Sequence, residues 1–135
     1  MSNWNGILII QEIQHLDSNG KILWQDKNIK NTLHQEGEQF LLQAAFTGGQ
    51  VSTIIPTNYY LGLDDRSVVL ATDTMDTVTG EPSIGGYTRQ PITSDGDFAI
   101  NFDGTHYSAQ SPIVAFRSTS QSWGPVSNLF MTDKT

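Results

Sequence analysis

Acidic residues are the groups in this chain whose spacing could support chemistry. The stretch "DDR" at 64–66 places two carboxylates beside an arginine, and "DTMD" at 73–76 separates two acids by about one helical turn. Adjacent residues on a strand face opposite ways, so Asp64 and Asp65 cannot readily share a proton or a substrate. We therefore interpret residues 64–66 as a solvated turn that carries a surface ion pair.

Two further stretches, "DGDF" at 95–98 and "DGTH" at 103–106, combine acids with glycine as some calcium loops do. An EF-hand needs several oxygen ligands at alternating positions and a late glutamate, and neither stretch has them. Asp-Gly is also a common turn dipeptide, which favours a structural role. The three histidines, at 15, 34 and 106, are too far apart for a sequence-local metal motif. We expect no metal site and no cofactor, although the sequence does not decide whether the loop acids bind a cation.

Motifs of known enzymes give no stronger signal. The sequence contains no G-x-S-x-G elbow, H-E-x-x-H pair, P-loop or dinucleotide fingerprint. His106 lies near Asp103 and Ser108, but a catalytic triad depends on geometry that this spacing does not supply. We therefore expect a protein without catalytic residues. The alternative, a bacterial enzyme or regulator that shares the fold, depends on the unassigned acids alone.

Composition favours one domain with uncharged polar surfaces. The 135 residues include 12 Gly, no Cys and only 16% charged residues, with a net charge of −7. We expect an N-terminal arm at 1–6 and a single β-rich domain at 7–135. The acidity disfavours nucleic-acid and anionic-membrane binding. The longest apolar run, "ILII" at 7–10, is too short to span a bilayer, and without a signal-type segment we expect synthesis in the cytoplasm.

Residues 7–29 predict a β-hairpin, because "ILIIQEIQHL" and "KILWQDKNI" flank a turn that contains Asn19-Gly20. The sequence leaves two registers open. A three-residue loop places Leu16 opposite Ile22, whereas a two-residue loop places Ile13 opposite Trp24.

A single helix is predicted at about residues 33–46. Thr32 and Gln35 have the spacing of a capping box, and Gly48-Gly49 supplies a stop signal. One stripe at helical period should face the domain's own sheet; its members are Leu33, Gly37, Phe40, Leu41 and Ala44. Leu42 and Phe46 project from the other side. They are covered either by another chain or by the loop predicted at 71–86.

After Gly49 the apolar period changes to two, which indicates strands. We predict strands at 57–63, 87–93, 97–102, 111–119 and 123–131, with a candidate short strand at 66–70. Pro91 restricts 87–93 to an edge or bulged strand. Because crossover helices are lacking, the predicted fold is mainly β: an antiparallel β-sandwich or small barrel with one α-helix.

Trp4 lies in the polar segment "MSNWNG", before any predicted strand. Chain ends are ordered only when something holds them, and an aromatic side chain in such an arm is typical of an interface anchor. Together with the apolar residues that lack cover in the predicted fold, it gives a candidate protein interface of Trp4, Ile7, Leu8, Leu42 and Phe46.

The order of several short motifs resembles a group of small structural proteins of tailed bacteriophages. The motifs are "DKNIKNTLHQEGEQFLLQAAFTGG", "NYYLGLDDR", "DTM", "GEPSIGGYTRQPI" and "IVAFRSTSQSWGPVSNLFMTD", which together lie within residues 22–133. The resemblance implies a virion component without enzymatic activity. The roles it implies are capsid decoration and parts of tails or fibres.

On this resemblance we expect a capsid decoration (cement) protein that bridges neighbouring capsid subunits. Its partners would be the major capsid protein and copies of itself, in a homotrimer or as lattice neighbours, with no nucleic acid and no membrane. The alternative is a tail or tail-fibre component that acts as a protein- or glycan-binding module.

Overall fold

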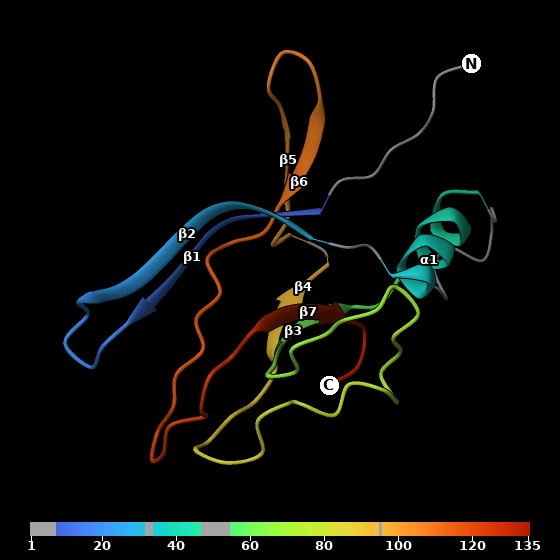
Figure 1. Ribbon diagram of the computed structural model, residues 1–135. Helices are drawn as coiled ribbons and strands as arrows, with labels where there is room; N and C mark the ends of the chain where they lie inside the picture. Colours follow the sequence, from blue (N-terminus) through green and yellow to red (C-terminus); the bar gives the residue numbers. More distant parts are fainter. Residues whose placement is uncertain (1–7, 32–33, 47–54, 95) are drawn as a thin grey trace.

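The computed structural model describes residues 8–31, 34–46, 55–94 and 96–135 (Figure 1). The fold is mainly β, with antiparallel sheets and one short helix, as the sequence predicts. Three separate sheets contain two, three and two strands, and within the described residues they do not close into a sandwich or a barrel. The elements in chain order are β1 (Leu8–Leu16), β2 (Ile22–Asn31), α1 (Gln35–Phe46), β3 (Asn58–Asp64), β4 (Gln90–Thr93), β5 (Ala99–Phe102), β6 (Tyr107–Gln110) and β7 (Asn128–Thr132).

Strands β1 and β2 form a long antiparallel hairpin, hereafter the arm hairpin. Its turn has a three-residue loop: Asp17 N–H donates to the Lys21 carbonyl at 2.9 Å, and Gly20 has a φ of 82°. Leu16 therefore pairs with Ile22, which is the first of the two predicted registers. The register shifts between His15 and Leu16, so that His15 pairs with Trp24 and Leu23 is the extra residue of a bulge.

Helix α1 begins at Gln35, two residues later than predicted. The Gln35 N–H donates to the carbonyl of Ala71 at 3.0 Å, so the loop after β3 supplies a partner for one of the free amides of the first turn. Phe40 packs edge-to-face on Tyr59 of β3, with ring centroids 6.1 Å apart. Thr32, Leu33 and Gly48-Gly49, on which the predicted cap, stripe and stop depended, lie outside the described residues.

The central sheet has the order β4-β3-β7, and all its neighbours are antiparallel. Strand β4 lies at an edge, where Pro91 pairs with Tyr60 without having to donate to a further strand. The Phe130 ring of β7 lies directly against Gly62 of β3, in the space that any Cβ at this position would occupy. Glycine is therefore required here by the close approach of the two residues.

The remaining strands form a short hairpin of β5 and β6, which projects from the central sheet in Figure 1. Its turn is stabilised by Asp103, whose carboxylate accepts from the N–H groups of Thr105 and His106 at 2.8 and 2.7 Å. Strand β6, with the sequence "YSAQ", was not predicted, because it becomes a strand only by pairing with β5. The "DGTH" stretch thus has the predicted turn role.

Two predicted strands are wrong. Residues 66–70 and 111–119 have no strand partner and form irregular segments. Residues 111–119 cross the molecule as a connection whose far end is held by Thr119, since its N–H donates to the Gly85 carbonyl at 2.9 Å. Apolar β-branched residues make these stretches resemble strands, but a strand needs a neighbour in register, and neither segment pairs with any of the described strands.

The buried core of the described residues is very small. Among the residues that the structure describes, the buried large hydrophobic side chains are Ile92 and Leu63, which are 1% and 8% exposed. Asp64, which follows Leu63 in β3, is also buried, at 2% exposure. All three belong to the central sheet, so the sheet holds the core and the hairpins and helix extend from it.

Candidate protein-interaction surface

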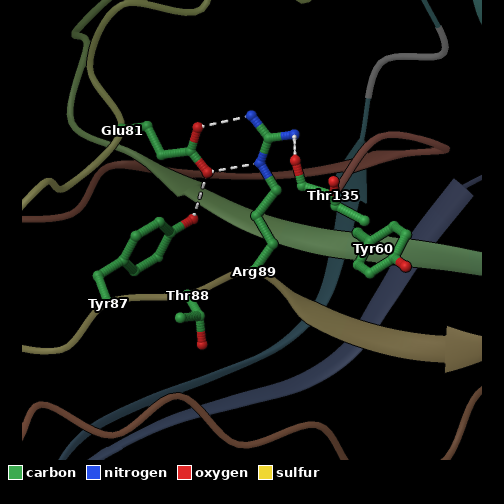
Figure 2. A pocket seen from close by; sticks show the side chains of 6 residues that line it. All are labelled: Tyr60, Glu81, Tyr87, Thr88, Arg89 and Thr135. Carbon is green, nitrogen blue, oxygen red and sulfur yellow. Dashed lines mark hydrogen bonds and ion pairs between the residues drawn. The ribbon is translucent and has the colours of Figure 1, made fainter.

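The central sheet is held by a cluster of Glu81, Tyr87 and Arg89, hereafter the carboxylate clamp (Figure 2). The Glu81 carboxylate accepts from Arg89 Nε and Nη2 and from the Tyr87 hydroxyl, each at 2.7 Å. The Tyr87 hydroxyl also accepts from the N–H of Leu63 at 2.9 Å. The pairing of β3 with β4 stops at Leu61, opposite Gln90. Two residues further along β3, the Tyr87 hydroxyl therefore supplies the acceptor for the Leu63 N–H.

The clamp lines a shallow hollow of about 420 Å³, together with Tyr60, Thr88 and Thr135. The Arg89 guanidinium beside it, followed by the Tyr87 hydroxyl, keeps the pKa of Glu81 below its ordinary value. Burial is the main cause that raises the pKa of Tyr87. A general acid or base acts best with a pKa near neutral. The pKa of Glu81 is lowered and that of Tyr87 is raised, so both move away from neutral. We interpret the hollow as a structural feature of the scaffold.

A second cluster fixes the loop that follows β3. Arg66 Nε donates to the buried Asp64 carboxylate at 2.9 Å, and Arg66 Nη2 lies 3.2 Å from Asp73 Oδ2. The hydrogen bond that Arg66 donates to the Asp64 carboxylate is the main cause that raises the pKa of Arg66. The interpretation of 64–66 as a solvated turn is therefore wrong for Asp64, whose carboxylate is buried because the folded loop brings Arg66 back over it.

Two aromatic side chains pack against the ring of Tyr87, the tyrosine of the carboxylate clamp. The Tyr87 ring stacks on Phe116, with centroids 6.3 Å apart, and meets Trp123 edge-on at 5.5 Å. Trp123 Nε1 donates to the Gly85 carbonyl at 3.3 Å. The Cβ of any other residue at Gly85, which has a φ of 65°, would approach the Trp123 ring. The motif segments "GGYTRQPI" and "RSTSQSWGP" thus meet in space although they are far apart in the sequence.

The arm hairpin presents large apolar side chains to solvent. Its pairing places Ile9, Ile13 and Trp24 on one face, and Leu16 and Ile22 on the other, with Leu23 at the bulge. Ile13 is half-buried, whereas Trp24 is 52% and Leu23 58% exposed. Within the described residues, no other helix or strand packs its backbone against this hairpin. A side-chain hydrogen bond joins it to the short hairpin, where the Gln110 amide donates to Gln11 Oε1 at 3.0 Å.

Helix α1 presents a second apolar surface. Leu42 is 61% and Phe46 66% exposed, so the loop at 71–86 does not cover them. Leu41, predicted for the inner stripe, is also 49% exposed, whereas Phe40 of the same stripe packs on Tyr59 of the central sheet. Glu38 lies one turn before Leu41 and Leu42 and is exposed on the same side of the helix.

The short hairpin presents a third surface. The Phe102 and Tyr107 rings lie 4.7 Å apart across the strand pair, and they are 56% and 77% exposed. Ile100 is exposed beside them. The acids of this region do not gather into a site; among the described residues no group of three or more His, Asp or Glu is placed to hold a metal ion.

The five predicted interface residues fall into two groups. Trp4 and Ile7 lie outside the described residues, and Leu8 is the first residue of β1, with a side chain that is not described. Leu42 and Phe46 lie on α1, where their side chains are 61% and 66% exposed. Their role at an interface stays a prediction.

The sequence reasoning missed most of the exposed apolar surface. Trp24, Leu23 and Tyr107 lie on strands, where apolar residues are ordinarily taken as core. The sequence does contain a signal for this exposed surface, since the arm hairpin carries apolar residues on both faces. A two-stranded hairpin with only one neighbouring layer can cover one face at most.

Comparison of the chain with models of protein families, with curated proteins and with solved structures gives no match. Among the described residues, no helix has the length and apolar character needed to cross a membrane. The candidate site is accordingly defined by geometry alone: apolar side chains on three elements that extend from a clamped central sheet.

Proposed function

We propose that this chain is a non-enzymatic structural protein of a bacteriophage virion, a capsid decoration (cement) protein that bridges neighbouring capsid subunits. The observation that carries the proposal is the contrast between two buried large hydrophobic side chains and nineteen exposed ones among the described residues. Such a distribution is typical of a subunit whose folded state is completed by other chains.

The sequence motifs add support, because they fall on the scaffold. The segment "NYYLGLDDR" forms β3 and the loop that Arg66 closes, and "GGYTRQPI" carries Tyr87, Arg89 and strand β4. Several residues of these motifs have a structural role. Glu81, Tyr87 and Arg89 form the clamp, Gly62 leaves space for the Phe130 ring, and Asp64 is buried. The resemblance to phage structural proteins therefore depends on residues that build one connected structure.

In the proposed mechanism the exposed side chains become buried between capsid subunits. Burying the remaining exposed part of Leu42 and Phe46 would contribute about 1–2 kcal/mol each. Many equivalent contacts on one lattice add through avidity, so a modest single contact holds the shell against internal DNA pressure. No bond is made or broken, which agrees with a clamp whose titratable groups are committed to structure.

The test is binding to expanded, DNA-free capsids made from the major capsid protein encoded in the same genome. We expect co-sedimentation at a copy number comparable to that of the major capsid protein, and weaker binding by Leu42→Asp. Ile113→Asp is the matched control, because Ile113 is fully exposed on a connecting segment away from α1. Absence of capsid binding by the wild-type chain would refute the proposal.

A second candidate function is a tail or tail-fibre component that binds a protein or a glycan. The paired rings of Phe102 and Tyr107 favour it, because adjacent exposed aromatic side chains are suited to stacking on sugar rings. Copy number separates the two functions. A few copies per particle, in a small multiple of three or six, would support the tail component and exclude decoration.

A further inference from the structure

The arm hairpin contains one residue whose backbone conformation is not that of a strand. Among the described residues, Asn28 is the one residue other than glycine with a positive φ, at 55°. A residue of an antiparallel strand has a φ of about −140°, so the chain leaves the extended path at Asn28 and enters the left-handed region. Asparagine tolerates this region in turns, but Asn28 lies inside strand β2.

The pairing of the two strands is interrupted at the same place. Every residue of β1 except Gln11 has a partner in β2, and the residue that lies opposite Gln11 is Asn28. The pairs on either side keep one register, so no extra residue is inserted here, in contrast to the bulge at Leu23. The interruption is therefore a kink in the hairpin, and residues 12–27, hereafter the distal arm, lie beyond it.

The kink is also the level at which the arm hairpin meets the short hairpin. The Gln110 amide, at the end of β6, donates to Gln11 Oε1 at 3.0 Å. The Gln110 side chain also accepts from Asn101 Nδ2 of β5 at 3.5 Å, so its own hairpin holds it while it reaches the arm. The bond between Gln11 and Gln110 joins two exposed neutral amides, and its net contribution is small because water competes for both groups.

The distal arm lacks the packing that would fix its direction. Within the part of the chain that the structure describes, no other helix or strand packs its backbone against the arm hairpin. Leu23 and Trp24, near its tip, are 58% and 52% exposed. Figure 1 shows the tip projecting away from the central sheet. The direction of the distal arm therefore depends on the backbone at Asn28 and on the hydrogen bond between Gln11 and Gln110.

We propose that Asn28 and Gln11 form a hinge at which the distal arm changes its direction, and that the hydrogen bond from Gln110 to Gln11 holds the direction observed. A residue kept in the left-handed region inside a strand costs stability, and such residues cluster where a protein binds or switches conformation. The hinge lets the exposed apolar side chains of the tip meet another surface at more than one angle. It is a property of the single chain and goes beyond the proposed capsid role.

The experiment uses the absence of cysteine in the chain, which allows spin labels to be attached at two introduced cysteines. Ser18, in the turn of the arm hairpin, and Ser127, whose N–H donates to the Asp64 carbonyl of the central sheet, are both exposed and are changed to cysteine. Ser18 lies about nine residues of roughly 3.3 Å beyond Asn28, so a rotation of about 20° at the hinge moves the label by about 10 Å. Pulsed dipolar electron spin resonance, with the labelled chain diluted in unlabelled chain, measures the distribution of distances within one molecule.

Removal of the hydrogen bond tests what holds the hinge. Gln110→Ala and Gln11→Ala should broaden the distance distribution to the same extent, and the double variant should broaden it no further, because all three lose the same bond. Gln14→Ala removes an equally exposed amide from β1 beyond the kink and should leave the distribution unchanged. A distribution that Gln110→Ala does not broaden would overturn the role of this hydrogen bond.

Substitution of Asn28 tests the hinge itself. Asn28→Val disfavours the left-handed region, because valine is β-branched, so the strand should straighten and the mean distance should shift by about 10 Å. Asn28→Gly accepts either sign of φ and should keep the mean distance while broadening the distribution. Gln25→Val, the same kind of change at a paired position of β2, is the control and should have no effect.

An unchanged distribution in both Asn28 variants would overturn the hinge. Amide hydrogen exchange of the distal arm shows whether the hairpin is intact in Asn28→Val; where it is not, the width measured for Asn28→Gly decides alone, and an unchanged width overturns the hinge. These measurements need no capsid. A chain that hinges but does not bind expanded capsids would refute the decoration role alone, so the two proposals fail in different assays.

Discussion

The central sheet and the elements that extend from it are built on different principles. Around the central sheet, polar side chains form hydrogen bonds with one another, as Glu81, Tyr87 and Arg89 do. In the arm hairpin and the short hairpin, backbone hydrogen bonds join the two strands while large apolar side chains face solvent, and α1 likewise exposes large apolar side chains. The comparison teaches that regular secondary structure forms in these elements without a buried core beside it, and we propose that other chains complete that core.

Removing core volume should have the largest effect on stability. Ile92→Ala removes three carbon atoms from the most deeply buried large hydrophobic side chain described, and we expect a loss of about 2–5 kcal/mol in the free energy of unfolding. Ile100→Ala, the same change at an exposed position of β5, should cost less than about 0.5 kcal/mol. Denaturant unfolding of the purified variants measures both values. Similar losses at the two positions would contradict the comparison between the sheet and the hairpins.

Adding a single methyl group to the central sheet should also be costly. In Gly62→Ala the new Cβ would occupy the position of the Phe130 ring, and we expect a loss of about 1–3 kcal/mol. In a Phe130→Leu background the same change should cost less, because the smaller side chain leaves room. A thermodynamic cycle over the four proteins measures the coupling. Equal costs in the two backgrounds would show that the ring is not the obstacle.

Breaking the carboxylate clamp should change both stability and its pH dependence. Glu81→Gln leaves Arg89 and the Tyr87 hydroxyl without a charged acceptor, and we expect a loss of about 1–2 kcal/mol at neutral pH. The pKa of Glu81 is lowered in the folded chain from its ordinary 4.5, so the clamp's contribution is complete above that pH and is lost as the pH falls through the folded value.

The variant should therefore show a shallower loss of stability on acidification below about pH 4.5 than the wild type does. Chemical unfolding at a series of pH values measures this difference. Asp76→Asn, a change at an exposed acid, is the control and should leave the profile as it is. A profile of Glu81→Gln that parallels the wild type throughout would argue against the clamp.

Weakening the turn of the short hairpin should have the smallest effect on global stability. Asp103→Ala removes the acceptor for the N–H groups of Thr105 and His106, and we expect less than about 1 kcal/mol in global unfolding. The backbone amides of Thr105 and His106 should nevertheless exchange faster with solvent, because local opening becomes easier. Amide hydrogen exchange measures this. A global loss as large as that of Ile92→Ala would mean that the short hairpin belongs to the core after all.

The sequence by itself determined the elements whose signals are local. Gly20 supplies the positive φ of the hairpin loop, the apolar spacing around Phe40 forms a helix, and Pro91 places its strand at a sheet edge. These follow from the conformational limits of single residues and from periodicity, which act over a few positions.

Only the tertiary structure decided which register the arm hairpin takes, that "YSAQ" becomes a strand while residues 111–119 do not, and that Asp64 is buried. It also decided that three sheets remain apart instead of closing on one another. Each of these outcomes depends on what lies opposite a segment in space. Partner strands, covering rings and counter-charges come from residues far along the chain, and their positions are set by the packing of the whole molecule.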